Sequence, residues 1–171
     1  MKISWQQQLK RKLTCARRIA ILGIGNIEKS DDGAGALCAD ILGREAHKKR
    51  PRNLKIINGG EVPENYTGDI RKFQPDHVII IDACVASKKP GTIYIVEPNK
   101  IKDEDISTHR MSLSMLVKFL EETIGCKTIV LGIEPKSLAW GTTISVPVQK
   151  AIITLSDYLR MYLENHSCIS A

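Results

Sequence analysis

Short runs of β-branched residues alternate along this chain with longer amphipathic stretches and with turn-forming residues. The clearest run is Val78 to Ile81, which follows the turn-forming sequence Gln74-Pro75-Asp76. Runs of this kind are typical of strands that are buried on both faces of a parallel sheet. Amphipathic helices between such strands cover the two faces of the sheet. The alternation therefore predicts an α/β fold with three layers, α/β/α, around a mostly parallel sheet.

The same patterns predict where the elements lie. Strands are expected at 18–22, 54–57, 78–81, 92–96 and 128–133. Helices are expected at 33–46, 66–73, 111–124 and 148–163, and the first of them should bury Leu37, Ile41 and Leu42. Residues 1–17 are predicted to form a basic N-terminal extension with a short helix around Trp5 and Leu9, ahead of a single domain over residues 18–171.

The composition fits a cytoplasmic protein. A chain of 171 residues is long enough for one domain with one hydrophobic core. Its five cysteines are widely spaced and form no C-x-x-C pair, as is typical of reduced thiols. No apolar run reaches the roughly 20 residues that span a bilayer, and the N-terminus lacks the apolar stretch of a signal peptide. We therefore expect a cytoplasmic location and no membrane contact.

The formal charge of +6 comes largely from two basic segments, at residues 10–18 and 47–52. Basic proteins often bind nucleic acid, but neither segment contains the interleaved aromatic residues on which bases stack. A solvated surface is the ordinary interpretation of such charge runs, and contact with an acidic partner is the alternative. We expect no nucleic-acid partner.

A glycine-rich loop, GIGNIEKSDDGAG at residues 23–35, follows the first predicted strand. The dinucleotide fingerprint G-x-G-x-x-G requires its third glycine at position 28, where this chain has Glu28. Asp31 and Asp32 stand where a helix N-terminus would otherwise attract phosphate, and their charge repels an anion. The loop therefore favours a cation. One aspartate, Asp31, is expected to cap the following helix, and Glu28 is expected to be exposed.

Two further residues with ligand chemistry are expected near this loop. Asp82 follows the predicted strand 78–81, and His109 precedes the predicted helix 111–124. In open α/β sheets, sites form at the carboxyl ends of the strands. With Asp32 they offer two carboxylates and one imidazole, a set that suits Ni, Zn or Fe(II) with open coordination positions. A loop cap for Asp82 and a polar core position for His109 are the structural alternatives.

Five motifs occur in a fixed order between residues 19 and 163. They are GIGN at 23–26 with DDGAG at 31–35, GG at 59–60 with PENYTG at 63–68, IIDA at 80–83, TH at 108–109, and GIEP at 132–135 with Gly141 and Ser145. In this order the motifs resemble the hydrogenase maturation endopeptidases, which trim the large subunit of [NiFe] hydrogenases. The PENYTG segment is most similar to the branch that serves formate-hydrogenlyase-type and archaeal hydrogenases.

The resemblance implies a mixed five-stranded sheet in the order 2-1-3-5-4, with the fourth strand antiparallel. It also implies an endopeptidase of the aspartic type that removes a C-terminal peptide from a nickel-loaded large-subunit precursor. The family's metal-contacting and catalytic positions fall on Asp32, Asp82 and His109. Nickel is carried by the substrate in this family, so no tightly bound cofactor of the protein itself is expected. The expected partner is the precursor, and the protein is expected to be a monomer.

The metal would either polarise the scissile carbonyl or activate water. Gly59 and Gly60 are expected to let the backbone of the substrate approach closely, and an ordinary tight loop is the alternative.

Two other functions remain open at this point. A thiol hydrolase would use Cys84 as nucleophile and His109 as base, although acidic neighbours would raise the pKa of that thiol. A non-catalytic metal-docking protein or nickel chaperone would use the same three ligand residues. Tight nickel binding in the absence of any precursor would distinguish the chaperone from the protease.

Overall fold

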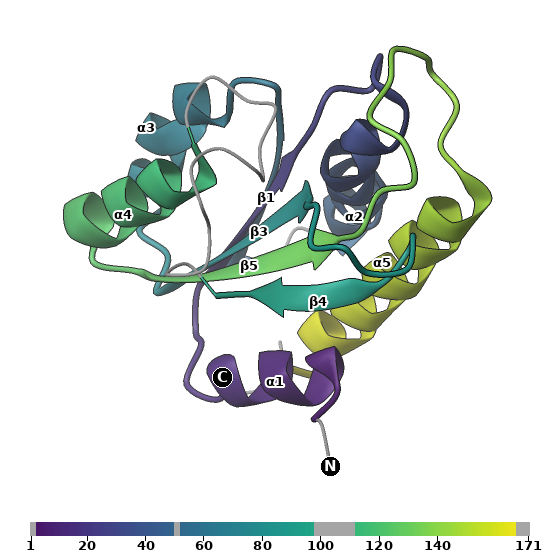
Figure 1. The fold of residues 1–171 in the computed structure, drawn as a ribbon. Coiled ribbons are helices and arrows are strands. Elements are labelled where there is room, and N and C mark those ends of the chain that lie inside the picture. Colours follow the sequence, from purple (N-terminus) through teal and green to yellow (C-terminus); the bar gives the residue numbers. More distant parts are fainter. Residues whose placement is uncertain (1–2, 50–51, 98–111, 167–171) are drawn as a thin grey trace.

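The computed structural model describes residues 3–49, 52–97 and 112–166, and Figure 1 shows their arrangement. The strands are β1 (Ile19–Ile24), β2 (Leu54–Gly60), β3 (His77–Ala83), β4 (Ile93–Val96) and β5 (Lys127–Ile133). The α-helices are α1 (Trp5–Lys12), α2 (Ala34–Lys49), α3 (Thr67–Phe73), α4 (Leu113–Ile124) and α5 (Val146–His166). Two short 3-10 helices, η1 (Ser30–Gly33) and η2 (Pro63–Tyr66), precede α2 and α3.

The five strands form one sheet in the order β2-β1-β3-β5-β4. β1 pairs in parallel with β2 and β3, and β3 pairs in parallel with β5. β4 pairs antiparallel with β5 at the edge of the sheet. The predicted α/β fold, the strand order and the antiparallel fourth strand are therefore confirmed.

The side chains of β3 alternate between two hydrophobic layers. Ile79 and Ile81 belong to the cluster that includes residues of α2 and α5, whereas Val78 and Ile80 belong to the cluster that includes residues of α3 and α4. Figure 1 shows these helix pairs on opposite sides of the sheet. All seven residues of β3 are buried, because the central strand is covered on both faces.

Helix α2 lies unusually close to the sheet. A Cβ atom added to Gly35 would lie 2.1 Å from the carbonyl oxygen of Ile81 and 2.4 Å from that of Ile24. Only a residue without a side chain allows this approach. The helix therefore buries small residues, and Ile41, predicted on the buried side, is instead 38% exposed. Leu42 is buried as predicted.

Helix α1 packs against the domain by its apolar side. Leu9 is fully buried in the layer that contains α2 and α5. The ring of Trp5 meets Tyr158 of α5 edge to face, with 5.0 Å between the ring centroids. The predicted short helix is thus present, and the basic residues of its last turn, Lys10, Arg11 and Lys12, are exposed. The division of the chain at residue 18 stays a prediction.

Most element boundaries lie one to three residues from the predicted ones, and those of β2 and α2 are examples. β2 extends to Gly60, because Asn58 and Gly60 continue the parallel pairing with the end of β1. The predicted helix 33–46 begins as the 3-10 turn η1 and continues as α2 to Lys49. Among the described helices, none has both the length and the apolar character needed to cross a membrane.

Candidate active site at the carboxyl edge of the sheet

The strand order places a topological switch point between the carboxyl ends of β1 and β3. The chain leaves β1 toward β2, which neighbours β1 on the side away from β3. The chain leaves β3 toward β4 and β5, which lie on the side of β3 away from β1. Ligand sites of open α/β sheets lie where neighbouring strands diverge in this way. Asp32 lies in η1 after β1, Asp82 lies at the end of β3, and η1 contacts β3.

Asp32 is held by the loop that precedes it. Its carboxylate oxygen Oδ2 accepts a hydrogen bond of 2.9 Å from the backbone N–H of Asn26, and the residue is 2% exposed. Asn26 is itself buried, and its side-chain oxygen accepts the N–H of Glu28. These contacts fix the position of the Asp32 carboxylate relative to β1. Glu28 is exposed, as predicted.

Asp31 anchors the segment between β5 and α5, and this role replaces the predicted helix cap. Its carboxylate accepts the backbone N–H groups of Lys136 (2.7 Å), Ser137 (3.1 Å) and Ser145 (2.7 Å). It also accepts the hydroxyl of Ser145 at 2.8 Å. The residue is fully buried. A buried carboxylate with four donors is a strong, fixed anchor, because hydrogen bonds to a charged group are stronger than neutral ones.

Asp82, near the end of β3, is fully buried. The alternation along β3 places it on the same face as Ile80 and Cys84, toward α3 and α4. The buried Glu134, directly after β5, accepts the N–H of Ala86 at 2.9 Å, and the hydroxyl of Tyr94 donates to the Cys84 carbonyl at 2.7 Å. Burial, followed by the charges of Cys84, Glu134 and Asp82, raises the pKa of Tyr94, so this hydroxyl keeps its proton.

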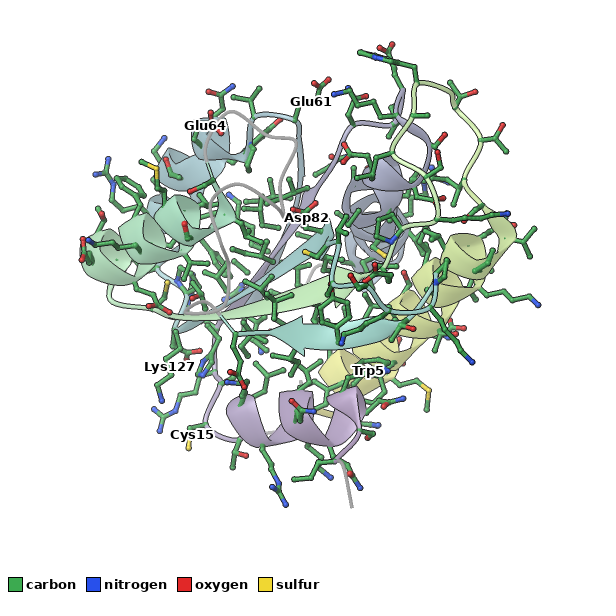
Figure 2. The ribbon with its side chains drawn as sticks, viewed as in Figure 1. Trp5, Cys15, Glu61, Glu64, Asp82 and Lys127 are labelled. Atoms are coloured by element: carbon green, nitrogen blue, oxygen red, sulfur yellow. The ribbon has the colours of Figure 1, made fainter. Side chains whose placement is uncertain are left out.

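Two further carboxylates lie toward the same edge of the sheet. Figure 2 shows Glu61 and Glu64, from the segment after β2, toward the carboxyl edge of the sheet, as Asp82 is, whereas Trp5 and Lys127 lie toward the opposite edge. The Oε2 atom of Glu64 is buried and has no hydrogen-bond partner among the described residues. Carboxylates gathered at one edge create a negative potential, which attracts cations.

The two glycines predicted to contact the substrate end β2. A Cβ atom on Gly59 would lie 2.8 Å from a methyl group of Leu22, so the space beside this glycine is filled by the chain itself. Gly60 has a φ of +54° and open space at its Cβ position, and its carbonyl accepts the N–H of Gly25 at 2.9 Å. Gly60 alone leaves room for an approaching backbone. Contact of either glycine with a substrate stays a prediction.

Cys84 is poorly suited to act as a nucleophile. The residue is 1% exposed. Burial raises the pKa of its thiol well above the usual value, and the charges of Asp82 and Glu134 raise it further. A thiol that stays protonated and inaccessible is unreactive. The structure therefore argues against the thiol hydrolase considered from the sequence.

His109 lies outside the described residues. In the basic segment 47–52, residues 50 and 51 also lie outside them, and residues 47–49 are described only as part of helix α2. The predicted set of Asp32, Asp82 and His109 can therefore be followed only for its two carboxylates, which the fold brings to one edge. Within residues 3–49, 52–97 and 112–166, no three Asp, Glu, His or Cys side chains form a group that could hold a metal ion.

Comparisons with known proteins agree with this architecture. A family model described as "Hydrogenase maturation protease" matches residues 38–159. The Hydrogenase 3 maturation protease of Escherichia coli (strain K12) is 35% identical over 141 residues, which make up 81% of this chain and 86% of that protein.

Solved structures show the same fold. The [NiFe] hydrogenase maturation protease HycI from Thermococcus kodakarensis KOD1 superposes with a TM-score of 0.80 at 29% identity, covering 92% of this chain and 99% of that one. The endopeptidase HycI from Escherichia coli superposes with a TM-score of 0.70 at 33% identity, covering 82% and 87%. The family model spans most of the described sheet and its helices, and the relatives align over most of their length. This chain therefore belongs to the hydrogenase maturation protease family and is a peptidase.

Proposed function

We propose that this protein is the endopeptidase that removes a C-terminal peptide from a nickel-loaded [NiFe] hydrogenase large-subunit precursor. Membership of the hydrogenase maturation protease family supports the reaction class and the kind of partner. The observation that carries the assignment of the site is the pair of buried carboxylates, Asp32 and Asp82, at the carboxyl ends of neighbouring strands. We place the reaction in the cytoplasm and expect a monomeric protein.

In this proposal the nickel arrives with the substrate. Asp32 and Asp82 bind it together with His109, and a backbone hydrogen bond from Asn26 already holds the Asp32 carboxylate. A borderline metal such as Ni²⁺ accepts oxygen and imidazole ligands and keeps positions open for its ligands in the precursor. Docking of the nickel places the scissile peptide bond beside it, where the metal polarises the carbonyl or activates water.

The proposal predicts that cleavage depends on the metal and on these carboxylates. A cognate large-subunit precursor is incubated with the protein in nickel-loaded and nickel-free forms, and the intact masses are measured. Only the loaded precursor should lose a C-terminal peptide, and Asp82→Asn and His109→Ala should lower the rate at least 100-fold, because each removes a group that contacts the reacting centre. Glu28→Gln, an exposed residue of the same loop as Asp32, is the matched control and should cleave normally.

Cleavage of the nickel-free precursor at the same rate would contradict the role of the metal. A folded protein that cuts neither precursor would favour the second candidate, a nickel chaperone, which shares the same carboxylates. Calorimetry separates the two functions, since the chaperone should bind nickel with sub-micromolar affinity in the absence of any precursor, whereas the protease requires no such affinity.

The proposal also predicts that the buried thiol is dispensable. Cys84→Ala should retain cleavage within about twofold, since a protonated, buried thiol takes no part in the chemistry. Cys15→Ala, at an exposed position toward the opposite edge of the sheet (Figure 2), is the matched control for loss of a thiol. Complete loss of cleavage by a folded Cys84→Ala variant, with Cys15→Ala unaffected, would restore the thiol mechanism.

A further inference from the structure

Beside the candidate site, one loop carries an exposed tryptophan, and a neighbouring loop carries a lysine that lies over its ring. Trp140 is 73% exposed, Ile27 is 56% exposed, and the ammonium nitrogen of Lys29 lies 5.0 Å from the centre of the Trp140 ring. We call Lys29 and Trp140 the docking platform, and Ile27 lies two residues before Lys29 in the same loop. The loop with Lys29, the first loop, follows β1 and the loop with Trp140, the second loop, follows β5, so both leave the carboxyl edge of the sheet, and Figure 1 shows them side by side.

The backbone under the docking platform is fixed by contacts between the two loops. The N–H of Ser30 donates to the Gly141 carbonyl at 2.5 Å, and the N–H of Gly141 donates to the Glu28 carbonyl at 2.8 Å. Lys29 and Gly141 form an isolated parallel bridge. Asp31 fastens the same second loop from inside the fold. Trp140, next to Gly141, therefore projects from a rigid support although its side chain is exposed.

This arrangement is typical of a binding surface. An indole ring that is mostly exposed contributes little to the core of its own protein, whereas tryptophans dominate the energy of many protein interfaces. A rigid support lowers the conformational entropy that binding would otherwise cost. Lys29 adds a positive charge over the ring, beside a site that contains the buried acidic groups Asp32, Asp82 and Glu134.

We propose that the docking platform binds a segment of the protein substrate that carries an apolar side chain next to an acidic one. The apolar side chain packs on the exposed part of the Trp140 ring, and the acidic side chain pairs with Lys29. The charge of Lys29 offsets the repulsion that the carboxylates of the site would otherwise exert on an acidic segment. The inference rests on the proposed function, since the substrate is the precursor. The platform and the site share one support, because Asp31 holds the second loop and the adjacent Asp32 belongs to the site. Docking would therefore position the precursor relative to Asp32.

Labelling with 5-fluorotryptophan tests the contact directly. The chain has two tryptophans, so a Trp5→Phe background leaves Trp140 as the only source of a fluorine resonance. Adding the unlabelled nickel-loaded precursor should shift or broaden this resonance. The binding signal does not require cleavage, and a precursor with a blocked cleavage site serves equally well.

Kinetics test the contribution to catalysis. Trp140→Ala and Lys29→Glu should each raise KM for the nickel-loaded precursor about 10- to 30-fold and leave kcat within about twofold, since neither residue is among the proposed metal-binding and catalytic groups. The effect of Lys29→Glu should shrink as salt is added. Ile153→Ala and Lys150→Glu remove an exposed apolar residue and an exposed lysine of α5, and these matched controls should change neither constant.

Each outcome has a distinct meaning. Normal cleavage with unchanged KM in both platform variants, together with an unmoved resonance, overturns the docking inference and leaves the proposed function intact. A moved resonance without any cleavage supports docking and overturns the proposed catalysis. A precursor that neither moves the resonance nor is cut overturns both, and a fall in kcat at unchanged KM contradicts a docking role.

Discussion

Replacing Asp31 by asparagine is expected to lower the free energy of unfolding by about 3 kcal/mol, because a buried amide cannot accept the four hydrogen bonds that the carboxylate accepts. The amide also turns its own N–H groups toward backbone N–H donors. For a chain of this length the loss corresponds to a melting temperature lower by roughly 10 °C. Thermal unfolding followed by circular dichroism measures it.

The same substitution should also slow cleavage of the nickel-loaded precursor at least tenfold at temperatures where the variant is folded. The reason is that the loop carrying Trp140 loses its anchor next to Asp32. Glu28→Gln is the control, since it changes an exposed carboxylate of the same loop. Unchanged stability of Asp31→Asn would show that the anchor contributes little to the fold, contrary to its burial.

Replacing Gly35 by alanine is expected to have a comparable effect on stability, of about 3 kcal/mol. The new Cβ would lie 2.1 Å from the backbone oxygen of Ile81, and a backbone oxygen cannot move aside as a flexible side chain can. Helix α2 must therefore shift away from the sheet. Because Ile81 precedes Asp82 and Gly35 follows Asp32 by one turn, the shift changes the separation of the two carboxylates. Both the melting temperature and the rate of precursor cleavage should fall.

Gly43→Ala is the matched control for this prediction. It lies in the same helix, and its Cβ would meet only a methyl group of Ile56 at 4.0 Å. Alanine favours the helix over glycine by about 0.5–1 kcal/mol, so this variant should be slightly more stable than the parent protein and equally active. Equal loss of stability in the two variants would contradict the close approach of α2 at Gly35.

Much of the fold follows from local patterns. The β-branched run 78–81 forms the central strand, and α4 and α5 each bury an apolar side, as expected of amphipathic helices. Asp82 reaches the carboxyl edge of the sheet simply because it ends β3. Strand order and the antiparallel edge strand followed from the resemblance of five motifs to a known family, and the structure confirms them.

The role of Asp31 and the surface of α2 did not follow from local patterns. A cap is the common role of an aspartate before a helix, but the hydrogen-bond partners of Asp31 are 105 to 114 residues away. The exposed Ile41 has the same origin, because the contact of Gly35 with the backbone of β1 and β3 decides which side of α2 faces the sheet. In the sequence, the presence of Gly141 and Ser145 among the family motifs was the sign that this loop has a fixed role.

By itself the sequence determined the alternation of strands and helices, the burial of β3 and the placing of carboxylates after two strands, since periodicity and turn chemistry act over a few residues. Only the tertiary structure decided that Asp31 anchors the loop of Trp140 and that Lys29 lies against that ring. Those contacts join segments more than a hundred residues apart, beyond the few residues over which periodicity and turn chemistry act.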